Sequence, residues 1–486
     1  MKKLLTFLFI SITTFSFSQN SWMQVYDIGD GTYLTNAKSV VQTNDNGYII
    51  TGRIDTSLYL IKTNNFGDTS WIKTFDNISS GGRSVKQTND DGYIVASSSR
   101  LLKTNSVGDT IWTGNYSNDT SNLSISSMDI TDDGGYVFTG NITWFSNNIG
   151  NNTMDLIIVK TDNQGVEQWV KTYGVPDDTS CFWCTWDKGN DIQQTSDGGY
   201  IITGYSHNTS VEGASLWLLK LNSLGNIMWE KFWDPIVLSP PSYEHECAGK
   251  SVKQTADGGY IIAGELNRST STPPFYSEFY EGYLIKTDSQ GNEEWSHKSN
   301  YLLYNEFESV VQTNDGGFIV LGITEELPFY EDGPILMKFN YLGDTLWTKT
   351  YGSSNEEDAG YSLIQSDDGG FVFTGTTKSF GTFGDRNIWL VKTDQNGIVS
   401  VNEIDEDAEI ILFPNPSNDI ITLAIAQHSN GQIILTDILG KEVLSNSFTI
   451  NEVQINLKSL ADKGTYFAKV IDVDGNVIAI KKLIYQ

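Results

Sequence analysis

Residues that build most catalytic and metal sites are scarce in this sequence. Its 486 residues include only three cysteines and four histidines. It contains no Gly-x-Ser-x-Gly turn, no His-Glu-x-x-His helix and no Gly-rich phosphate loop, the short patterns that serve nucleophilic, zinc-dependent and nucleotide chemistry. The common hydrolases, metalloproteases and nucleotide-dependent enzymes are therefore disfavoured.

Positive charge is scarce as well. The chain has 31 lysines and arginines against 60 aspartates and glutamates, a net charge of −29. A surface of this sign repels the phosphates of nucleic acids and of anionic lipids over a Debye length. We therefore expect no nucleic-acid partner.

Long apolar runs are missing except at the N-terminus. Lys2 and Lys3 precede an apolar stretch from Leu4 to about Ile12, and small residues follow. The stretch is too short to span a bilayer comfortably. Lysines, an apolar stretch and small residues, in this order, predict a signal peptide over residues 1–18. A buried N-terminal helix is the alternative. No later run is long enough for a transmembrane segment.

One repeated unit fills most of the chain. The segment from Ser39 to Gly52 recurs in copies that begin at Ser84, Ser127, Asp191, Ser251, Ser309 and Ser362. Each copy has an Asp, a Gly two places later and then Tyr or Phe. A second half follows each copy, so that one unit holds four short strands, which we call A, B, C and D. Four antiparallel strands repeated radially predict a β-propeller blade.

The ends of the repeat indicate how the ring closes. Strand D carries a Trp in six units, but Val401 stands there in the seventh. Trp22 to Tyr26 is a D strand with no A, B or C before it. We therefore predict an all-β, seven-bladed propeller over residues 19–400, in which the N-terminal strand completes blade seven. A stray strand beside an open solenoid is the alternative.

The turn between strands C and D has the motif Lys-Thr-Asp-x-x-Gly-x-x-x-Trp. It resembles the blade motif of quinoprotein-like propellers, one residue shorter. The resemblance implies the fold and not the quinone cofactor. The Asp-box of sialidases looks similar, but its spacings differ.

Long insertions fall only in the B–C and D–A connections, which share one face of the ring. Variable loops gathered on one face mark it as the functional face. We expect exposed aromatics there to bind a glycan or a surface protein, in blades four to six and off the ring axis. The alternative is that they form small cores within the loops. The candidates are Trp144, Trp183, Trp186, Tyr276, Tyr280 and Tyr330.

Acidic residues on the same face leave a calcium ion possible, although no Asp-x-Asp-x-Asp-Gly loop occurs. The repeated Asp of the A–B hairpin is expected to cap its own turn instead. No other cofactor is indicated. The densest catalytic cluster is Tyr243, His245 and Glu246, which would serve a polysaccharide lyase or glycosidase.

The three cysteines lie in loops of the same face. Cys181 and Cys184 precede blade four and Cys247 precedes blade five. An exported protein can form disulfides, and three cysteines allow any of three pairings, each of which leaves one thiol free. A zinc site with His245 is the weaker alternative, since too few ligands lie nearby. We therefore predict no metal site.

After an acidic linker at 401–409, residues 410–486 change character. Alternating apolar residues and frequent turns predict a small Ig-like β-sandwich. The segment resembles the type A C-terminal sorting domain of type IX secretion in the Bacteroidota. The resemblance implies Sec export, passage through the type IX machinery and release or anchoring at the cell surface. The matching motif residues are Phe413, Pro414, Asn415, Pro416, Asp437, Gly440, Lys441, Gly464 and Tyr466.

These observations favour an exported binding or adhesion protein. The rival hypotheses are a polysaccharide lyase or glycosidase acting on the same face, and a structural component of the surface layer.

Overall fold

The structure is a computed structural model of the chain. It describes residues 21–28, 35–117, 121–144, 153–174, 186–207, 213–233, 245–270, 277–299, 304–326, 331–352, 357–380, 386–399, 410–413, 420–425, 430–436, 441–449, 452–460, 463–471 and 477–485. Residues 1–18 and 401–409 lie outside these ranges, so the signal peptide and the linker remain predictions. The chain forms two compact units that divide between Val399 and Ser400.

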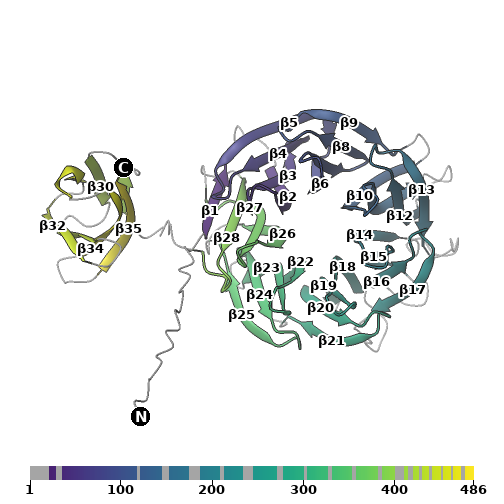
Figure 1. The fold of residues 1–486 in the computed structure, drawn as a ribbon. Coiled ribbons are helices and arrows are strands. Elements are labelled where there is room, and N and C mark those ends of the chain that lie inside the picture. Colours follow the sequence, from purple (N-terminus) through teal and green to yellow (C-terminus); the bar gives the residue numbers. More distant parts are fainter. Residues whose placement is uncertain are drawn as a thin grey trace, which may run out of the picture. The chain divides into compact units, whose positions relative to one another are not determined.

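The first unit is a ring of seven four-stranded antiparallel blades, of which blades four and five join into one eight-stranded sheet through a short parallel pairing (Figure 1). The innermost strand of each blade is strand A. The strands are, in blade one, β2 (Thr35–Gln42), β3 (Tyr48–Ile54), β4 (Ser57–Thr63) and β5 (Thr69–Ser79); in blade two, β6 (Gly82–Gln87), β7 (Tyr93–Ser97), β8 (Arg100–Thr104) and β9 (Thr110–Asn115); in blade three, β10 (Ser121–Ile130), β11 (Tyr136–Trp144), β12 (Thr153–Thr161) and β13 (Glu167–Tyr173); in blade four, β14 (Asp187–Gln194), β15 (Tyr200–Ser206), β16 (Gly213–Leu221) and β17 (Ile227–Trp233).

The remaining three blades follow the same order. They are, in blade five, β18 (His245–Gln254), β19 (Tyr260–Thr270), β20 (Ser277–Thr287) and β21 (Glu293–Lys298); in blade six, β22 (Tyr304–Gln312), β23 (Phe318–Glu326), β24 (Glu331–Phe339) and β25 (Thr345–Thr350); in blade seven, β26 (Ala359–Gln365), β27 (Phe371–Thr377), β28 (Asn387–Thr393) and β1 (Trp22–Tyr26).

Strand β1 is the outer strand of blade seven. It pairs antiparallel with β28, from Trp22 opposite Lys392 to Tyr26 opposite Ile388. The prediction that the N-terminal strand closes the ring is thus confirmed, and with it the all-β, seven-bladed fold. Closure joins the N-terminal strand to the last three strands of the repeat within one sheet, which ties the two ends of the ring together.

The A–B hairpins are held by a repeated ion pair. The Asp of each hairpin accepts hydrogen bonds within its own turn, as in Asp197, which accepts from the Thr195 hydroxyl and the Gly199 amide. It also binds a buried lysine of strand C, Lys220 in this blade, at 2.9 Å. Equivalent pairs occur in the other blades: Lys62–Asp45, Lys103–Asp90, Lys160–Asp133, Lys286–Asp257, Lys338–Asp315 and Lys392–Asp368. The predicted turn cap is confirmed, and the lysine partner is new.

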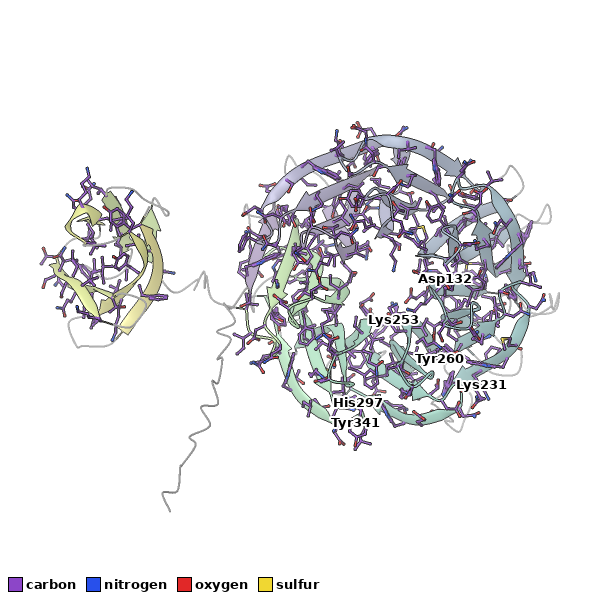
Figure 2. All side chains as sticks on the ribbon, in the orientation of Figure 1. Asp132, Lys231, Lys253, Tyr260, His297 and Tyr341 are labelled. Carbon is purple, nitrogen blue, oxygen red and sulfur yellow. The ribbon has the colours of Figure 1, made fainter. Side chains whose placement is uncertain are left out.

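Aromatic packing joins each blade to the next. The strand-D Trp of one blade packs on the aromatic residue that begins strand B of its neighbour, with ring centroids 5.7 to 6.1 Å apart in all seven contacts. Tyr260, labelled in Figure 2, receives Trp229 in this way. Seven hydrophobic clusters lie between successive blades. The Trp column is therefore a packing feature, as large rings fill the widening gap between blades.

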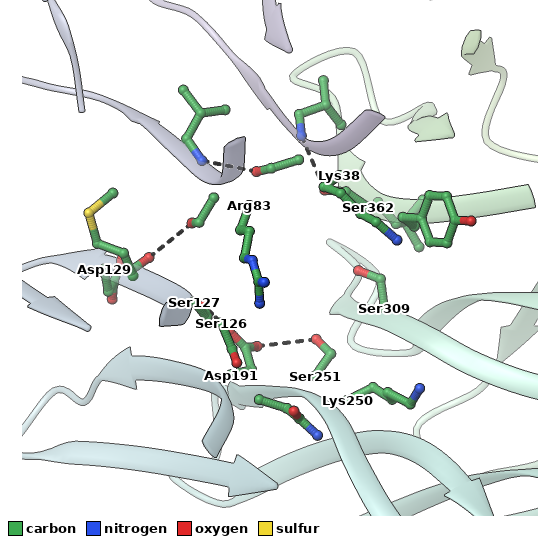
Figure 3. A pocket seen from close by; sticks show the side chains of 18 of the residues that line it. Lys38, Arg83, Ser126, Ser127, Asp129, Asp191, Lys250, Ser251, Ser309 and Ser362 are labelled. Carbon is green, nitrogen blue, oxygen red and sulfur yellow. Dashed lines mark hydrogen bonds between the residues drawn. The ribbon is translucent and has the colours of Figure 1, made fainter. Parts of the chain in front are cut away.

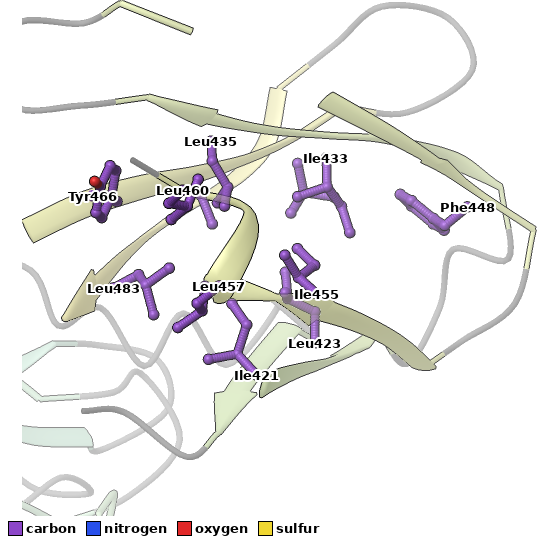
Figure 4. Packing of buried hydrophobic residues seen from close by; sticks show 12 residues of the cluster. Ile421, Leu423, Ile433, Leu435, Phe448, Ile455, Leu457, Leu460, Tyr466 and Leu483 are labelled. Atoms are coloured by element: carbon purple, nitrogen blue, oxygen red, sulfur yellow. The ribbon is translucent and has the colours of Figure 1, made fainter. Parts of the chain in front are cut away.

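The second unit is a small β-sandwich. One sheet contains β29 (Ile410–Phe413), β30 (Ile420–Ile425) and β33 (Glu452–Asn456), and the other contains β31 (Gly431–Thr436), β32 (Glu442–Phe448), β34 (Gly464–Ile471) and β35 (Val477–Tyr485). A short 3-10 turn, η1 (Leu457–Ser459), follows β33. Leu423, Leu435 and Tyr466 belong to the buried core between the sheets (Figure 4). No helix in the described ranges is long and apolar enough to cross a membrane.

Candidate ligand-binding site in the central channel

Every inner strand of the propeller carries a β-bulge. In blade one, Ala37 pairs with Gly52 and Ser39 with Thr51, so that Lys38 has no partner opposite it. The same slip recurs in the other six inner strands. A bulge redirects the extra side chain, here into the channel along the ring axis. We call these seven residues the bulge ring: Lys38, Arg83, Ser126, Asn190, Lys250, Glu308 and Tyr361.

Two cavities share the bulge ring. The lower one, about 220 Å³, extends toward the A–B hairpins and is lined also by Val41 and Gln193. The upper one, about 570 Å³, extends toward the D–A connections and the loop-rich face, where Asn36 and Tyr205 line it. Figure 3 shows Lys38, Arg83 and Lys250 reaching into the channel from three different inner strands.

Five basic side chains line the upper cavity: Lys38, Arg53, Arg83, Lys188 and Lys250. Among the described residues, Lys250 alone of the five has carboxylate partners, with its amine 3.1 Å from Glu265, 3.5 Å from Glu308 and 3.9 Å from Glu306. Within the described ranges, the other four make no ion pair, and the buried Nε of Arg53 has no hydrogen-bond partner. A chain of charge −29 thus concentrates uncompensated positive charge in one cavity.

The lower cavity is different, because the two cations that it does not share with the upper cavity are paired. Lys86 lies 3.5 Å from Asp129, and Lys253 lies 2.7 Å from Asp191. An anion entering the channel from the loop-rich face would therefore be attracted to the upper cavity and not drawn beyond it.

Enclosure and neighbouring positive charge lower the pKa of two lysines in the upper cavity. Enclosure in the channel, together with Arg83 and Lys250, lowers the pKa of Lys188 to about 8. Enclosure also lowers the pKa of Lys38 to about 8, with Lys250, Arg83 and Arg53 contributing. Lys38 remains exposed to channel water, whereas Lys188 is half-buried.

The acidic side of the cavity shows the opposite effect. Burial and the neighbouring Glu306 and Glu308 raise the pKa of Glu265 to about 7, although Lys250 acts against them. Burial alone would lower the pKa of Lys250, but Glu308, Glu265 and Glu306 raise it above its ordinary value. Lys250 therefore stays charged and is committed to the carboxylates.

An aromatic path leads from the rim of blade four into this cavity. The exposed Trp186 packs edge-on against His207, at 6.3 Å between centroids, and His207 packs against Tyr205 at 5.9 Å. Tyr205 lines the cavity, and Lys188 follows Trp186 by two residues. Three aromatic rings therefore lie in a row between the rim and the basic cavity.

The structure places three of the six predicted aromatics. Trp144 and Trp186 are exposed, and both lie beside the first residues of β12, since Trp144 pairs with Thr153 and Trp186 bridges to Met154. Tyr280 lies on β20 in blade five, opposite Asn267. Trp183, Tyr276 and Tyr330 fall outside the described residues. The predicted off-axis position differs from the cavity, which lies on the axis of the ring.

The predicted catalytic and disulfide residues are only partly placed. His245 and Glu246 begin β18 and pair in parallel with Gly213 and Ala214 of β16, which links blades four and five. Cys247 is buried in the core between those blades. Tyr243, Cys181 and Cys184 lie outside the described ranges, so the catalytic cluster and the disulfide pairing remain predictions.

The basic residues of the cavity were missed by the sequence analysis, although a signal exists. The position just before the first Ser or Asp of each repeat varies in charge, while the position after it is Ser in six copies and Asp in one. Across the described part of the chain, no three His, Cys, Asp or Glu side chains converge as metal ligands would. The calcium hypothesis gains no site from these residues.

In the second unit, the described motif residues are part of the sandwich. Phe413 ends β29, Gly464 begins β34 and Tyr466 is buried in the core, while Lys441 lies just before β32. Pro414, Asn415, Pro416, Asp437 and Gly440 lie outside the described ranges.

Comparison with known proteins identifies this second unit. Residues 411–486 match the family described as a secretion system C-terminal sorting domain. The segment is a type IX sorting domain. The protein is therefore exported by type IX secretion to the cell surface or the medium, and its sorting domain engages that machinery.

The chain is also similar to other proteins at low identity. An endo-acting ulvan lyase of Formosa agariphila is 24% identical over 182 residues. The match covers 35% of this chain and 31% of the lyase, so the chain spans about a third of that relative. Among solved structures, PorZ of Porphyromonas gingivalis, a surface component of the type IX system, is 11% identical, with a TM-score of 0.38 and coverage of 90% of this chain and 58% of PorZ. The Pan2 WD40 domain of Neurospora crassa is 10% identical, with a TM-score of 0.44 and coverages of 74% and 89%.

Proposed function

We propose that the propeller is an extracellular module that binds an acidic glycan through the upper cavity of its central channel. The observation that carries this proposal is the set of four basic side chains without carboxylate partners, Lys38, Arg53, Arg83 and Lys188, in one cavity of a strongly acidic protein. Carboxylate or sulfate groups of the glycan would supply the missing charge.

The surroundings favour a glycan over a bare inorganic anion. Trp186, His207 and Tyr205 offer ring faces and edges on which pyranose rings can stack. Asn36, Asn190 and Ser126 add amide and hydroxyl groups suited to sugar hydroxyls, and the Ser126 hydroxyl has no partner within the described structure. Export by the type IX route places the site where extracellular polysaccharides occur.

Calorimetric titration of the full chain with an acidic oligosaccharide tests the proposal. A charge-assisted hydrogen bond contributes about 1.5–3 kcal/mol, so the Arg83→Gln variant should bind roughly ten-fold or more weakly. The matched control is Lys86→Gln, because Lys86 lines the lower cavity and is already paired with Asp129. Equal affinities for wild type and Arg83→Gln would overturn the proposal.

A second candidate function is cleavage of the glycan. The relative in Formosa agariphila is an endo-acting ulvan lyase, and the upper cavity contains Glu265 with a pKa raised to about 7, close to the range for acid–base work. Mass analysis of the oligosaccharide after incubation separates the two, since a lyase produces unsaturated fragments and a binding module returns the ligand intact. A protein ligand on the loop-rich face or a structural role in the surface layer would leave every glycan unbound.

A further inference from the structure

Lys188 differs from every other lysine of the channel in its surroundings. It lies on β14, two residues before the bulge residue Asn190, and lines only the upper cavity. In the described structure its amine has no hydrogen bond and no ion pair, although Glu265 contributes a weak attraction. Its charged neighbours Arg83 and Lys250 are cations.

The other two lysines of the cavity are engaged. The Lys38 amine lies 3.3 Å from the centroid of the Tyr361 ring, a cation–π contact that favours the protonated form. Lys250 is surrounded by three carboxylates. Lys188 is therefore the lysine whose amine is available to react.

Surroundings of this kind change the chemistry of an amine. A lysine beside other cations in an enclosed pocket loses its proton more readily and becomes a nucleophile near neutral pH. With a pKa of about 8, roughly a quarter of Lys188 is neutral at pH 7.5, against about 0.1% for an ordinary lysine.

We propose that Lys188 forms an imine with the carbonyl group of an anionic ligand held in the upper cavity by Arg53 and Arg83. The inference rests on the proposed function, because the same basic groups hold the ligand's acidic group. The neutral amine nitrogen attacks the carbonyl carbon and a C–N bond forms. The carbonyl oxygen then leaves as water with the two amine hydrogens, so the step needs no oxidant and no reductant.

The ligand class follows from the cavity. A volume of about 570 Å³ admits a small molecule and excludes a folded partner. The shared chemistry is a carbonyl and a carboxylate or sulfate in the same molecule, which either a free oxo acid or the open-chain reducing end of an acidic sugar provides.

The test is reductive trapping on the full-length protein. Glyoxylate and sodium cyanoborohydride are added at pH 7.5, and the modified lysines are mapped by peptide mass analysis. We expect Lys188 to be modified at least ten-fold faster than Lys73, an outer-strand lysine that is paired with Asp109. Equal modification of the two lysines would overturn the inference.

Three controls sharpen the result. Arg83→Gln should slow trapping of glyoxylate at Lys188 more than trapping of uncharged propionaldehyde, because both reactions lose the effect of Arg83 on the amine but only glyoxylate also loses a partner for its carboxylate. Lys188→Arg should lose the modification. Calorimetric titration of the wild type with an acidic oligosaccharide needs no imine, so failure of the imine and failure of the proposed function are separable. Trapping of digalacturonate at Lys188 would assign the sugar reducing end as the ligand, and trapping of glyoxylate alone would assign an oxo acid.

Discussion

Asp191 offers the most stringent test of how the inner ring is held together. In the other six blades the equivalent residue is Ser, and in several of them its hydroxyl accepts one hydrogen bond from the next blade, as Ser39 does from the Val85 amide. Asp191 accepts from Ser127 at 2.7 Å, Val252 at 3.0 Å and Lys253 at 2.7 Å, and thus joins blades three, four and five.

The cost of removing this carboxylate can be worked out from its partners. Asp191→Ala removes the acceptor of the Ile192 and Val252 amides and of the Ser127 hydroxyl, whereas the Lys253 amine keeps the Val252 carbonyl. Each buried donor left unsatisfied costs about 1–3 kcal/mol, and channel water holds each of the three near the lower value, giving about 3 kcal/mol. The shift in Tm shrinks as domain size grows and is about 1–2 °C per kcal/mol here, so we expect a fall of about 3–6 °C.

Differential scanning calorimetry of the full chain measures this shift. Asp191→Ser should lose less than Asp191→Ala, because Ser can keep the single interblade hydrogen bond that other blades use. Asp109→Ala, which removes a fully exposed ion pair with Lys73, should leave Tm unchanged. If Asp191→Ala unfolds within 1 °C of the wild type, the account of the inner ring is wrong.

Other predictions concern pH and export. Affinity for an acidic oligosaccharide should fall as pH rises from 7 to 9, because the lowered pKa values of about 8 make Lys38 and Lys188 lose their positive charge there, and titration at several pH values checks this. The propeller should lose stability as pH falls from about 4 to 2. Ion pairs and turn hydrogen bonds outweigh desolvation and lower the pKa of four hairpin carboxylates to about 2, below the unfolded value near 3.9, so their stabilising contribution is lost as they become protonated; the four are Asp90, Asp133, Asp197 and Asp257. Acid titration followed by circular dichroism measures this loss. Removing residues 411–486 should keep the protein inside the cell envelope, which fractionation and immunoblotting would detect.

Most of the fold was predictable because it repeats. Seven copies of one hairpin pattern indicate the blade, and the isolated Trp22 strand indicates how the ring closes. The Lys–Asp pairs were not predicted, since the lysine of strand C and the hairpin Asp are brought together only by the pairing of strands. Lys220 and Asp197, for example, are separated by the whole of strand B.

The site was harder to predict for a geometric reason. A strict alternation of side chains assigns Lys38 and Ser39 to opposite faces of strand A, but the bulge breaks this alternation and turns Lys38 into the channel. Net charge misled as well, since a total of −29 hides a cavity lined by five basic residues. The exposed aromatics were easier to predict. The exposure of Trp186, for example, follows from its position in a loop.

The central claim is that the charge of the ligand is recognised in the channel. The most direct measurement compares one oligosaccharide in two forms, oligogalacturonate and its methyl ester, by calorimetric titration against the full chain at two salt concentrations. We predict that the acid form binds at least ten-fold more tightly than the ester and that this advantage shrinks as salt is raised. Equal affinity for the acid and the ester at low salt would contradict the account.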